Sequence, residues 1–211
     1  MIPAGSGNDF ARSLGIPLHY KKALLRIFDQ RYKRVDLLQL EKRYCLTVTG
    51  FGFDGEVAQA TNKANYKRWL NQFGLGSLSY VFSMLNVLRS YRPTSIKLRV
   101  DKEELSFSDV WLVAVANSPN YAGGVRICPQ AVQDDGELNI CIVHGLSKWR
   151  LLLLFVRAYR GTHINHRSVH LAKGKEVFIQ TSEPVSVHSD GETILDRPVH
   201  LEIKKGALKV V

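Results

Sequence analysis

Short strand signals that recur along most of the chain constrain its fold more than any other feature. After residue 32, runs of β-branched and other apolar residues alternate with turns rich in Gly, Asp, Pro and Ser. Such runs are typical of antiparallel strands joined by tight connections. The pattern predicts a β-sandwich. Its expected strands are residues 35–40, 44–49, 96–100, 110–116, 138–143, 177–180, 185–188 and 199–203, with a hairpin turn at Glu41-Lys42-Arg43 between the first two.

Two helical stretches interrupt this pattern. The first covers about residues 56–91 and has a glycine break at Gly74-Leu75-Gly76. The second covers about residues 147–160 and has an apolar body with basic residues at both ends. A short helix of this kind is normally packed against a core, and we favour that interpretation here.

The chain begins with a glycine-rich motif that suits an anionic ligand. Within residues 3–12 (Pro-Ala-Gly-Ser-Gly-Asn-Asp-Phe-Ala-Arg), the two glycines around Ser6 allow the backbone to approach a ligand closely. Asn8 or Asp9 can cap the helix that follows, which leaves free amides near the ligand. The motif predicts a phosphate-binding loop at residues 5–8, and the alternative is a capped helix start after a glycine turn.

The tripeptide Asp-Gly-Glu occurs three times, and each copy has to be weighed against a simple turn, for which Asp-Gly is common. At Asp54 the residues that follow look helical, so N-capping explains the aspartate best. At Asp134-Asp135 an acidic pair precedes a strand, which suits either a hard cation with oxygen ligands or a surface turn. At Asp190-Gly191-Glu192 a sharp turn can project Glu192 into a cleft, where its carboxylate can accept a hydroxyl proton.

Five motifs follow one another along the chain: PAGSGNDFARSLGIP at residues 3–17, Val35-Asp36, GFGFDGEVA at 50–58, NSPNYAGGVRICPQAVQDDGELNI at 117–140, and SDGE at 189–192. In this order they resemble the C-terminal two-thirds of diacylglycerol kinase-type lipid kinases, a superfamily that also contains sphingosine and ceramide kinases. Ser6 replaces the family's usual threonine and keeps the hydroxyl. Family members also carry an upstream Gly-Gly-Asp-Gly-Thr loop within a complete nucleotide-binding α/β half, and this sequence has neither.

The resemblance implies a mainly β fold with helical insertions, the β-sandwich C-terminal domain of a two-domain lipid kinase. Residues 1–31 would be a remnant of the nucleotide-binding α/β domain, and residues 32–211 would form the β-sandwich domain. The implied activity is ATP-dependent phosphorylation of a lipid hydroxyl, as in a diacylglycerol kinase. Because this sequence lacks the upstream loop, we expect the chain alone to be inactive. The alternative is a non-catalytic lipid-binding or regulatory fragment.

The resemblance also assigns roles to individual residues. Phosphoryl transfer depends mainly on positioning and charge neutralisation, so the expected parts are a base, a phosphate loop and Mg²⁺. Glu192 matches the family's catalytic base, with Asp190 as a supporting residue. The ATP phosphates would be held by Gly5, Ser6, Gly7 and Asn8. The Mg²⁺ ion would be held, directly or through water, by Asp9, Asp36, Asp134 and Asp135.

The charge of the chain favours anionic partners. Lysine and arginine outnumber aspartate and glutamate by 29 to 19, and the net charge of +10 suits membrane surfaces, ATP or nucleic acid. The sequence has no zinc-finger, RNP or helix-turn-helix signature, so we expect no nucleic-acid partner. The set Lys63, Lys67, Arg68 and Trp69 suits either a peripheral contact with anionic lipid or a solvated helix face. No run reaches the ~18 apolar residues of a membrane span, so we expect a cytoplasmic protein at the membrane periphery, with a homodimer left open.

Cysteine and histidine spacing gives no support for a metal site. Cys45, Cys128 and Cys141 lack CxxC spacing, so we expect reduced, buried thiols. His163, His166 and His170 can gather imidazoles only on a helix, and β-branched neighbours favour a loop that enters a strand. We therefore expect solvated or edge histidines.

Overall fold

A computed structural model describes residues 1–5, 7–29, 32–64, 76–194 and 199–211 of the chain, without the side chains of residues 76–80. The strands are β1 (Lys33–Leu40), β2 (Arg43–Cys45), β3 (Val48–Gly52), β4 (Thr94–Val100), β5 (Glu103–Ala116), β6 (Leu138–His144), β7 (Val169–Gly174), β8 (Glu176–Thr181), β9 (Val187–Ser189), β10 (Glu192–Ile194) and β11 (Val199–Val210). The helices are α1 (Asp9–Ser13), α2 (Tyr20–Phe28), α3 (Phe53–Lys63), α5 (Gly76–Ser90), α6 (Lys148–Tyr159) and the 3-10 helix η1 (Thr162–Asn165).

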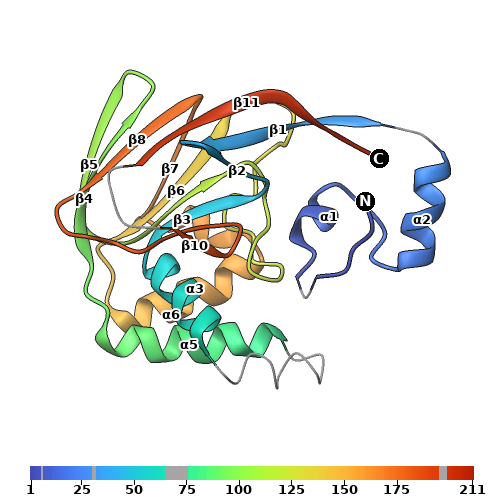
Figure 1. Cartoon of the computed structure of the whole chain (residues 1–211). Helices are drawn as coiled ribbons and strands as arrows, with labels where there is room; N and C mark the ends of the chain where they lie inside the picture. The colour runs from blue at the N-terminus through green and yellow to red at the C-terminus, as the bar shows by residue number, and fades with distance from the viewer. Residues whose placement is uncertain (6, 30–31, 65–75, 195–198) are drawn as a thin grey trace.

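Strand β5 is the centre of one antiparallel sheet. Its first half pairs with β4, and its second half pairs with β3 on one side and β6 on the other. The strand changes course at Asp109, where φ is 49°, and its two ladders shift register between Thr94 and Ile96 and between Val110 and Leu112. Such irregularities bend a strand and increase its twist. The sheet curls in the order β10-β9-β3-β5-β4-β8-β11-β1-β2, with β6 and β7 branching from β5 (Figure 1).

Two apolar layers explain the continuous apolar runs in the central strands. One core consists only of strand residues and lies within the curled sheet, whereas the other lies between the sheet and helices α3, α5 and α6. Along β5, Val113 and Val115 belong to the first core, and Leu112 and Ala114 belong to the second. Because both faces of this strand are buried, it needs no alternation with polar residues.

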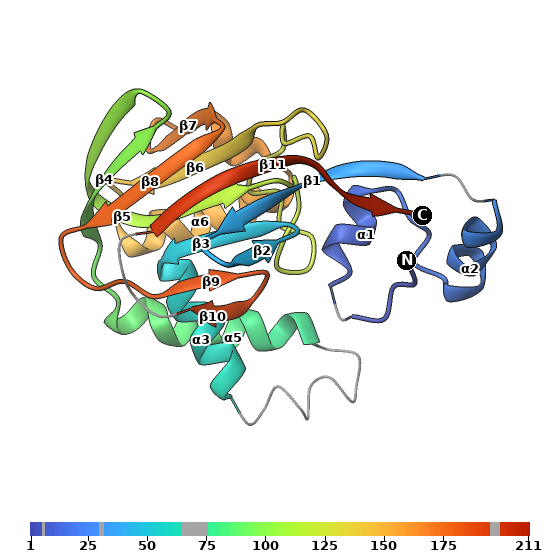
Figure 2. The ribbon, with the colours of Figure 1, turned by 45° about the horizontal axis from the view of Figure 1, so that its top comes forward.

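The N-terminal segment packs on the ends of two distant strands. A small third core joins Phe10 and Ala11 of α1 and Ala23 of α2 to Val35 of β1 and Val210 of β11. Figure 2 shows α1 and α2 beside the end of β11, away from the layer formed by α3, α5 and α6. The glycine-rich motif is therefore held against the sheet by the residues that follow it.

Every predicted strand overlaps an observed strand, and the predicted β-rich fold with helical insertions is confirmed. Two local predictions were wrong. The stretch 44–49 is divided, because β2 ends at Cys45 and β3 begins at Val48, and the hairpin turn contains only Glu41 and Lys42, since Leu40 pairs with Arg43. Within the described ranges, none of the helices is long and apolar enough to cross a membrane.

Candidate functional site

The glycine-rich loop is docked on the loop that begins at Asn117. The carboxylate Oδ2 of Asp9 accepts the Gly123 N–H at 2.8 Å, and the hydroxyls of Ser13 and Ser118 lie 2.6 Å apart. A Cβ atom at Gly7 would lie 2.8 Å from the Asp9 carboxylate and 3.3 Å from the Gly123 backbone. Gly7 is therefore needed for this close approach of the two loops.

The helix caps differ from the sequence prediction. Asn8 occupies the N-cap position of α1 with φ of 53°, but its Oδ1 accepts the Gly5 N–H at 2.9 Å and makes no bond to a helix amide. The Asp9 carboxylate binds Gly123 instead of the helix. The prediction that either side chain caps the helix was wrong, because both are used to fold and dock the loop. Ser6 lies outside the described residues.

Open space surrounds the tip of the second loop. Gly123 and Gly124 have φ of 82° and 109°, and nothing lies within 4 Å of the position that a Cβ atom would take at either residue. Oδ1 of Asp9 is buried without a partner among the described residues. The amides of Gly5, Gly123 and Gly124 are bonded within the two loops, so the unpaired group that the described residues leave here is the Asp9 carboxylate oxygen.

Asp54 is the centre of a buried polar network. Its Oδ2 lies 2.8 Å from Nε2 of His188, and its Oδ1 accepts the Tyr121 hydroxyl at 3.2 Å. Strand β3 leads directly into α3 and pairs with β9, which places His188 opposite Gly50. A Cβ at Gly50 would collide with both the carboxylate and the imidazole. The sequence interpretation of Asp54 as a helix cap was wrong: the N-cap of α3 is Gly52, and the carboxylate is 2% exposed.

The network extends to the turn that carries Glu192. The Gly191 N–H donates to Nδ1 of His188 at 3.3 Å, so Nε2 carries the proton that is donated to Asp54. The Gly191 carbonyl accepts the side-chain amide of Asn62 at 2.8 Å. Both backbone polar groups of Gly191 are thus bound, and Glu192 follows as the exposed first residue of β10.

Asp190 organises the same turn from the other side. Its carboxylate accepts the backbone N–H groups of Leu46 at 2.6 Å and Thr47 at 2.9 Å, together with the thiol of Cys45 at 3.3 Å. Positive φ values of 50° at Asp190 and 85° at Gly191 are those of a type I′ hairpin turn. The bonds made by Asp190 also explain why the predicted strand 44–49 is interrupted.

The aspartates predicted to hold Mg²⁺ do not gather. Both oxygens of the buried Asp36 carboxylate accept backbone amides, from Gly206 at 2.6 Å and Gly136 at 2.7 Å. Asp134 pairs with Lys33 at 3.1 Å, and Asp135 lies 3.9 Å from the Lys173 ammonium group. Among the described residues, no group of three or more His, Cys, Asp or Glu side chains is arranged to hold a metal ion. As they stand, these aspartates do not fit a Mg²⁺ site, which needs several oxygen ligands around one point.

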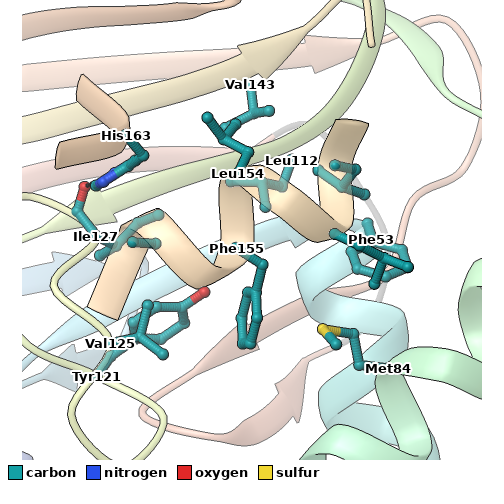
Figure 3. A pocket seen from close by; sticks show the side chains of 13 residues that line it. Phe53, Met84, Leu112, Tyr121, Val125, Ile127, Val143, Leu154, Phe155 and His163 are labelled. Atoms are coloured by element: carbon teal, nitrogen blue, oxygen red, sulfur yellow. Dashed lines mark hydrogen bonds between the residues drawn. The ribbon is translucent and has the colours of Figure 1, made fainter. Parts of the chain in front are cut away.

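An apolar cavity adjoins the polar network. Its volume is about 40 Å³, and Figure 3 shows Phe155 and Leu154 of α6 facing Phe53 of α3 and Met84 of α5 across it. Tyr121 also lines this cavity while its hydroxyl binds Asp54. Tyr121 therefore links the wall of the apolar cavity to the Asp54–His188 network, and neither Asp54 nor His188 lines the cavity itself.

The histidine and cysteine predictions had different outcomes. The three thiols are free and buried, as predicted, and burial raises the pKa of Cys45 and Cys141 to about 12. The prediction of a solvated or edge position was wrong for His163, which is 1% exposed and whose Nε2 donates to the Ile127 carbonyl at 3.0 Å. Burial lowers the pKa of this imidazole.

Comparisons with known proteins agree with this arrangement. Residues 47–211 match the family described as YegS C-terminal NAD kinase beta sandwich-like domain, and residues 1–40 match the diacylglycerol kinase catalytic domain. A diacylglycerol kinase of Mycobacterium tuberculosis is 31% identical over 217 residues, which cover 100% of this chain and 68% of that protein. The chain belongs to the diacylglycerol kinase family of lipid kinases.

Other members of this family are similar over most of the chain. A diacylglycerol kinase of Bacillus subtilis is 27% identical over 193 residues, covering 91% of this chain and 61% of that protein. A crystal structure of a diacylglycerol kinase from Bacillus anthracis superposes with a TM-score of 0.73 at 24% identity, covering 99% of this chain and 66% of that one. The last comparison concerns the fold alone, and it agrees with the predicted β-sandwich. Kinases of this family transfer a phosphoryl group, which implies the use of ATP.

The sequence reasoning missed two members of the polar network. Tyr121 stands within a motif that was recognised, but no local pattern marks its hydroxyl as a partner of Asp54. His188 stands in a short strand before Asp190-Gly191-Glu192, and its partner Asp54 lies 134 residues earlier. Nothing within a few residues of either position signals this pairing.

Proposed function

We propose that this chain provides the lipid-binding and proton-accepting part of an enzyme that phosphorylates a lipid hydroxyl with ATP. One observation carries the proposal: the apolar cavity is lined in part by Tyr121, whose hydroxyl belongs to the network that also binds the Glu192 turn. A lipid alcohol has the same division between an apolar chain and a polar end. An apolar lining with a few polar groups is usual for small-molecule sites, but at about 40 Å³ this cavity would have to widen to admit a lipid chain.

The proposed chemistry assigns Glu192 as the base. The lipid hydroxyl oxygen attacks the γ-phosphorus of ATP, the bond to the β-phosphate oxygen breaks, ADP leaves, and Glu192 accepts the hydroxyl proton. Binding of Gly191 by His188 and Asn62 supports this role, since it restricts the backbone directly before the base.

The proposed phosphate site is the loop at Gly5, Gly7 and Asn8, with Ser6 between them. Its support is the open space beside Gly123 and Gly124, next to the tight contact at Gly7. Helix α1 has only five residues, so its dipole adds little to anion binding. The amides of Gly5 and Gly123 are bonded within the loops, so the basic charge of the chain would supply most of the attraction.

Magnesium remains a prediction of the family resemblance. Asp36 uses both carboxylate oxygens on backbone amides, and Asp134 and Asp135 are paired with lysines. Of these four aspartates, only Asp9 has a buried oxygen with no partner among the described residues. We therefore assign no step of the reaction to the ion.

Peripheral membrane contact and a cytoplasmic location are also proposals. Of the residues predicted to meet anionic lipid, Lys63 is exposed at the end of α3, whereas Lys67, Arg68 and Trp69 lie outside the described residues. A lipid substrate requires some contact with a bilayer, and the net charge of +10 favours an anionic one.

A lipid-panel assay tests the function. The chain, alone and joined to a family half that carries the Gly-Gly-Asp-Gly-Thr loop, is given ATP with diacylglycerol, phosphatidylglycerol, a sphingoid base or an undecaprenol-like alcohol. We expect phosphorylation of one lipid by the joined protein and little by the chain alone. Lipid binding by the joined protein without phosphorylation of any of these lipids would contradict the proposal and favour a non-catalytic lipid-binding fragment.

Substitution of Glu192 tests the base. In the joined protein, Glu192→Gln keeps the shape of the side chain but cannot take the proton, so kcat should fall by on the order of 10² to 10⁴ with little change in ATP affinity. The matched control is Glu183→Gln, at an exposed glutamate before β9, which should leave kcat unchanged. Equal kcat values for Glu192→Gln and the control would remove Glu192 from the mechanism.

A further inference from the structure

Helix α6 has apolar residues on two opposite faces. Leu151, Leu154 and Ala158 are buried and pack against the sheet and α3. At 100° per residue, Trp149, Leu153 and Val156 lie on the opposite face, centred about 180° away. These three side chains are 79%, 68% and 65% exposed. The sequence prediction of a core-packed helix therefore accounts for only one side of α6.

The charges around this outer face have a single sign. Helix α6 contains lysine and arginine but no aspartate or glutamate. Arg150 and Arg157 lie on one flank of the exposed apolar face, and Arg160 follows at its C-terminal end. Apolar residues with an exposed tryptophan, bordered by cations, are the pattern of a helix that lies in the interface of an anionic bilayer.

The position of α6 connects this face with the proposed lipid site. Leu154 and Phe155 on the inner side of α6 line the apolar cavity. Tyr159 lies at the end of the helix, and its pKa is raised, first by burial and second by the negative charge of Asp9. The end of α6 therefore lies close to Asp9. A bilayer on the outer face of α6 would therefore lie beside the wall of the cavity and near the glycine-rich loop.

A second helix provides a natural comparison. Helix α2 also exposes apolar side chains, with Leu24 at 42%, Leu25 at 64% and Phe28 at 72%, and it carries Lys21 and Lys22. It lies in the segment that matches the diacylglycerol kinase catalytic domain, and none of its residues lines the apolar cavity. Helix α6 differs from α2 in two ways: its inner side lines the apolar cavity, and its outer side carries the exposed Trp149.

We infer that the outer face of α6, formed by Trp149, Leu153 and Val156 with Arg150 and Arg157 beside it, docks on an anionic phospholipid bilayer. The inference rests on the proposed lipid function, for which it names the membrane-facing surface. The tryptophan and leucine side chains enter the headgroup region, and the arginines contact lipid phosphates. Docking brings the cavity wall formed by α6 next to the lipid.

Vesicle co-sedimentation of the full chain without ATP tests the surface. Vesicles of phosphatidylglycerol with phosphatidylcholine should bind the chain, vesicles of phosphatidylcholine alone should bind it less, and added salt should weaken the binding. Leu153→Gln with Val156→Gln should reduce the partition coefficient at least about tenfold. Arg150→Glu with Arg157→Glu should reduce it by at least roughly fivefold for each cation removed.

The matched control is Leu24→Gln with Leu25→Gln on α2, which removes two exposed leucines from the other apolar helix face. It should leave vesicle binding unchanged, and all variants should keep the wild-type melting temperature because the altered side chains are exposed. In a Trp69→Phe background, fluorescence of Trp149 should shift to shorter wavelength on vesicle binding and be quenched by brominated lipid, while the buried Trp111 stays constant.

Three results would overturn the inference. The first is equal binding to neutral and anionic vesicles. The second is a loss of binding in the α2 control but not in the α6 variant. The third is conversion of a dimer to a monomer by the α6 variant, because that result would assign the face to a second copy of the chain. Because the assay needs no ATP, a chain that docks through α6 but fails to phosphorylate lipid would contradict only the proposed activity.

Discussion

At the scale of single residues, the buried pair of Asp54 and His188 is the contact on which most of the candidate site depends. The imidazole donates to Asp54 through Nε2 and accepts the Gly191 N–H through Nδ1. Removal of the imidazole would leave the buried Asp54 carboxylate with one hydrogen-bond donor fewer. His188 thus connects the stability of the fold with the position of the Glu192 turn.

His188→Ala should lower the free energy of unfolding by about 3 kcal/mol, because it leaves the Asp54 carboxylate buried with one bond fewer. Hydrogen exchange of the Gly191 amide should become faster as well. The control is His200→Ala, which breaks a 2.7 Å contact between His200 and Glu176. The side chains of these two residues are 38% and 50% exposed, so the variant should change the free energy of unfolding by less than about 1 kcal/mol. Chemical denaturation and amide exchange measure both effects, and similar losses in the two variants would contradict the role of His188.

His163 should make the fold sensitive to acid. Burial lowers its pKa from the ordinary value of 6.5, and the hydrogen bond to the Ile127 carbonyl opposes the shift. Below pH 6.5 the unfolded chain therefore binds a proton that the folded chain resists, so stability is complete above that pH and falls as pH decreases toward the lowered pKa.

His163→Gln keeps an N–H donor for Ile127 and cannot titrate, so its stability should fall less between neutral pH and about pH 5. Part of the acid effect should remain, because burial and then His170 lower the pKa of His144 also. Urea unfolding over this pH range gives the comparison. Parallel curves for the wild type and the variant would show that His163 does not titrate in this range.

At the scale of elements, Gly55 decides how closely α3 approaches β9. A Cβ at this position would collide with the Ser186 carbonyl, and a backbone atom cannot move aside as a flexible side chain can. In an ordinary helix, replacement of glycine by alanine stabilises the helix by about 1 kcal/mol. Here the collision reverses the sign of the effect.

Gly55→Ala should lower the free energy of unfolding by about 1–3 kcal/mol, because overpacking forces α3 away from the strand that carries His188. Gly5→Ala is the matched control, since its Cβ would lie 3.4 Å from Oδ1 of Asn8, an ordinary contact. Thermal melts compare the two. A stabilised Gly55→Ala protein would mean that α3 and β9 separate without cost.

At the scale of the whole molecule, the predicted Mg²⁺ residues lie in two places. Asp9 joins the N-terminal loop to Gly123, whereas Asp36 of β1 accepts the Gly136 N–H and so lies against the connection before β6 that carries Asp134 and Asp135. A metal ion would have to draw these parts together and displace lysines from two of the carboxylates.

The described contacts predict that Mg²⁺ changes the melting temperature of the wild type and of Asp135→Asn equally. The variant should melt lower in both conditions, because it weakens the bond from Asp135 to the Glu137 N–H and the contact with Lys173. Calorimetry with Mg²⁺ and with a chelator makes the measurement. A stabilisation by Mg²⁺ that only Asp135→Asn loses would instead support the metal site implied by the family resemblance.

The sequence alone determined most of the strands and the family, although it missed β10 and the first half of β5. Strand runs and turn residues express backbone preferences that act within a few positions, so the second half of β5 and the Asp190-Gly191 turn were predictable. The five motifs were recognisable for a similar reason, because each is continuous in the chain. The glycines of the first motif predicted close approach to an anionic ligand, and the contact that the structure shows at Gly7 is with Gly123 of another loop.

Only the tertiary structure decided which polar groups meet and which apolar faces stay exposed. Asp54 reads locally as a helix cap, yet the pairing of β3 with β9 brings it to a histidine 134 residues away. The family resemblance predicts that Asp36 is a metal residue, yet its carboxylate accepts hydrogen bonds from the backbone amides of Gly206 and Gly136, which lie in two segments distant in sequence. On α6 the apolar residues are alike in sequence, and packing buries Leu154 but leaves Leu153 in solvent. Partner choice depends on burial and geometry across the whole fold, and neither is encoded within a few neighbouring residues.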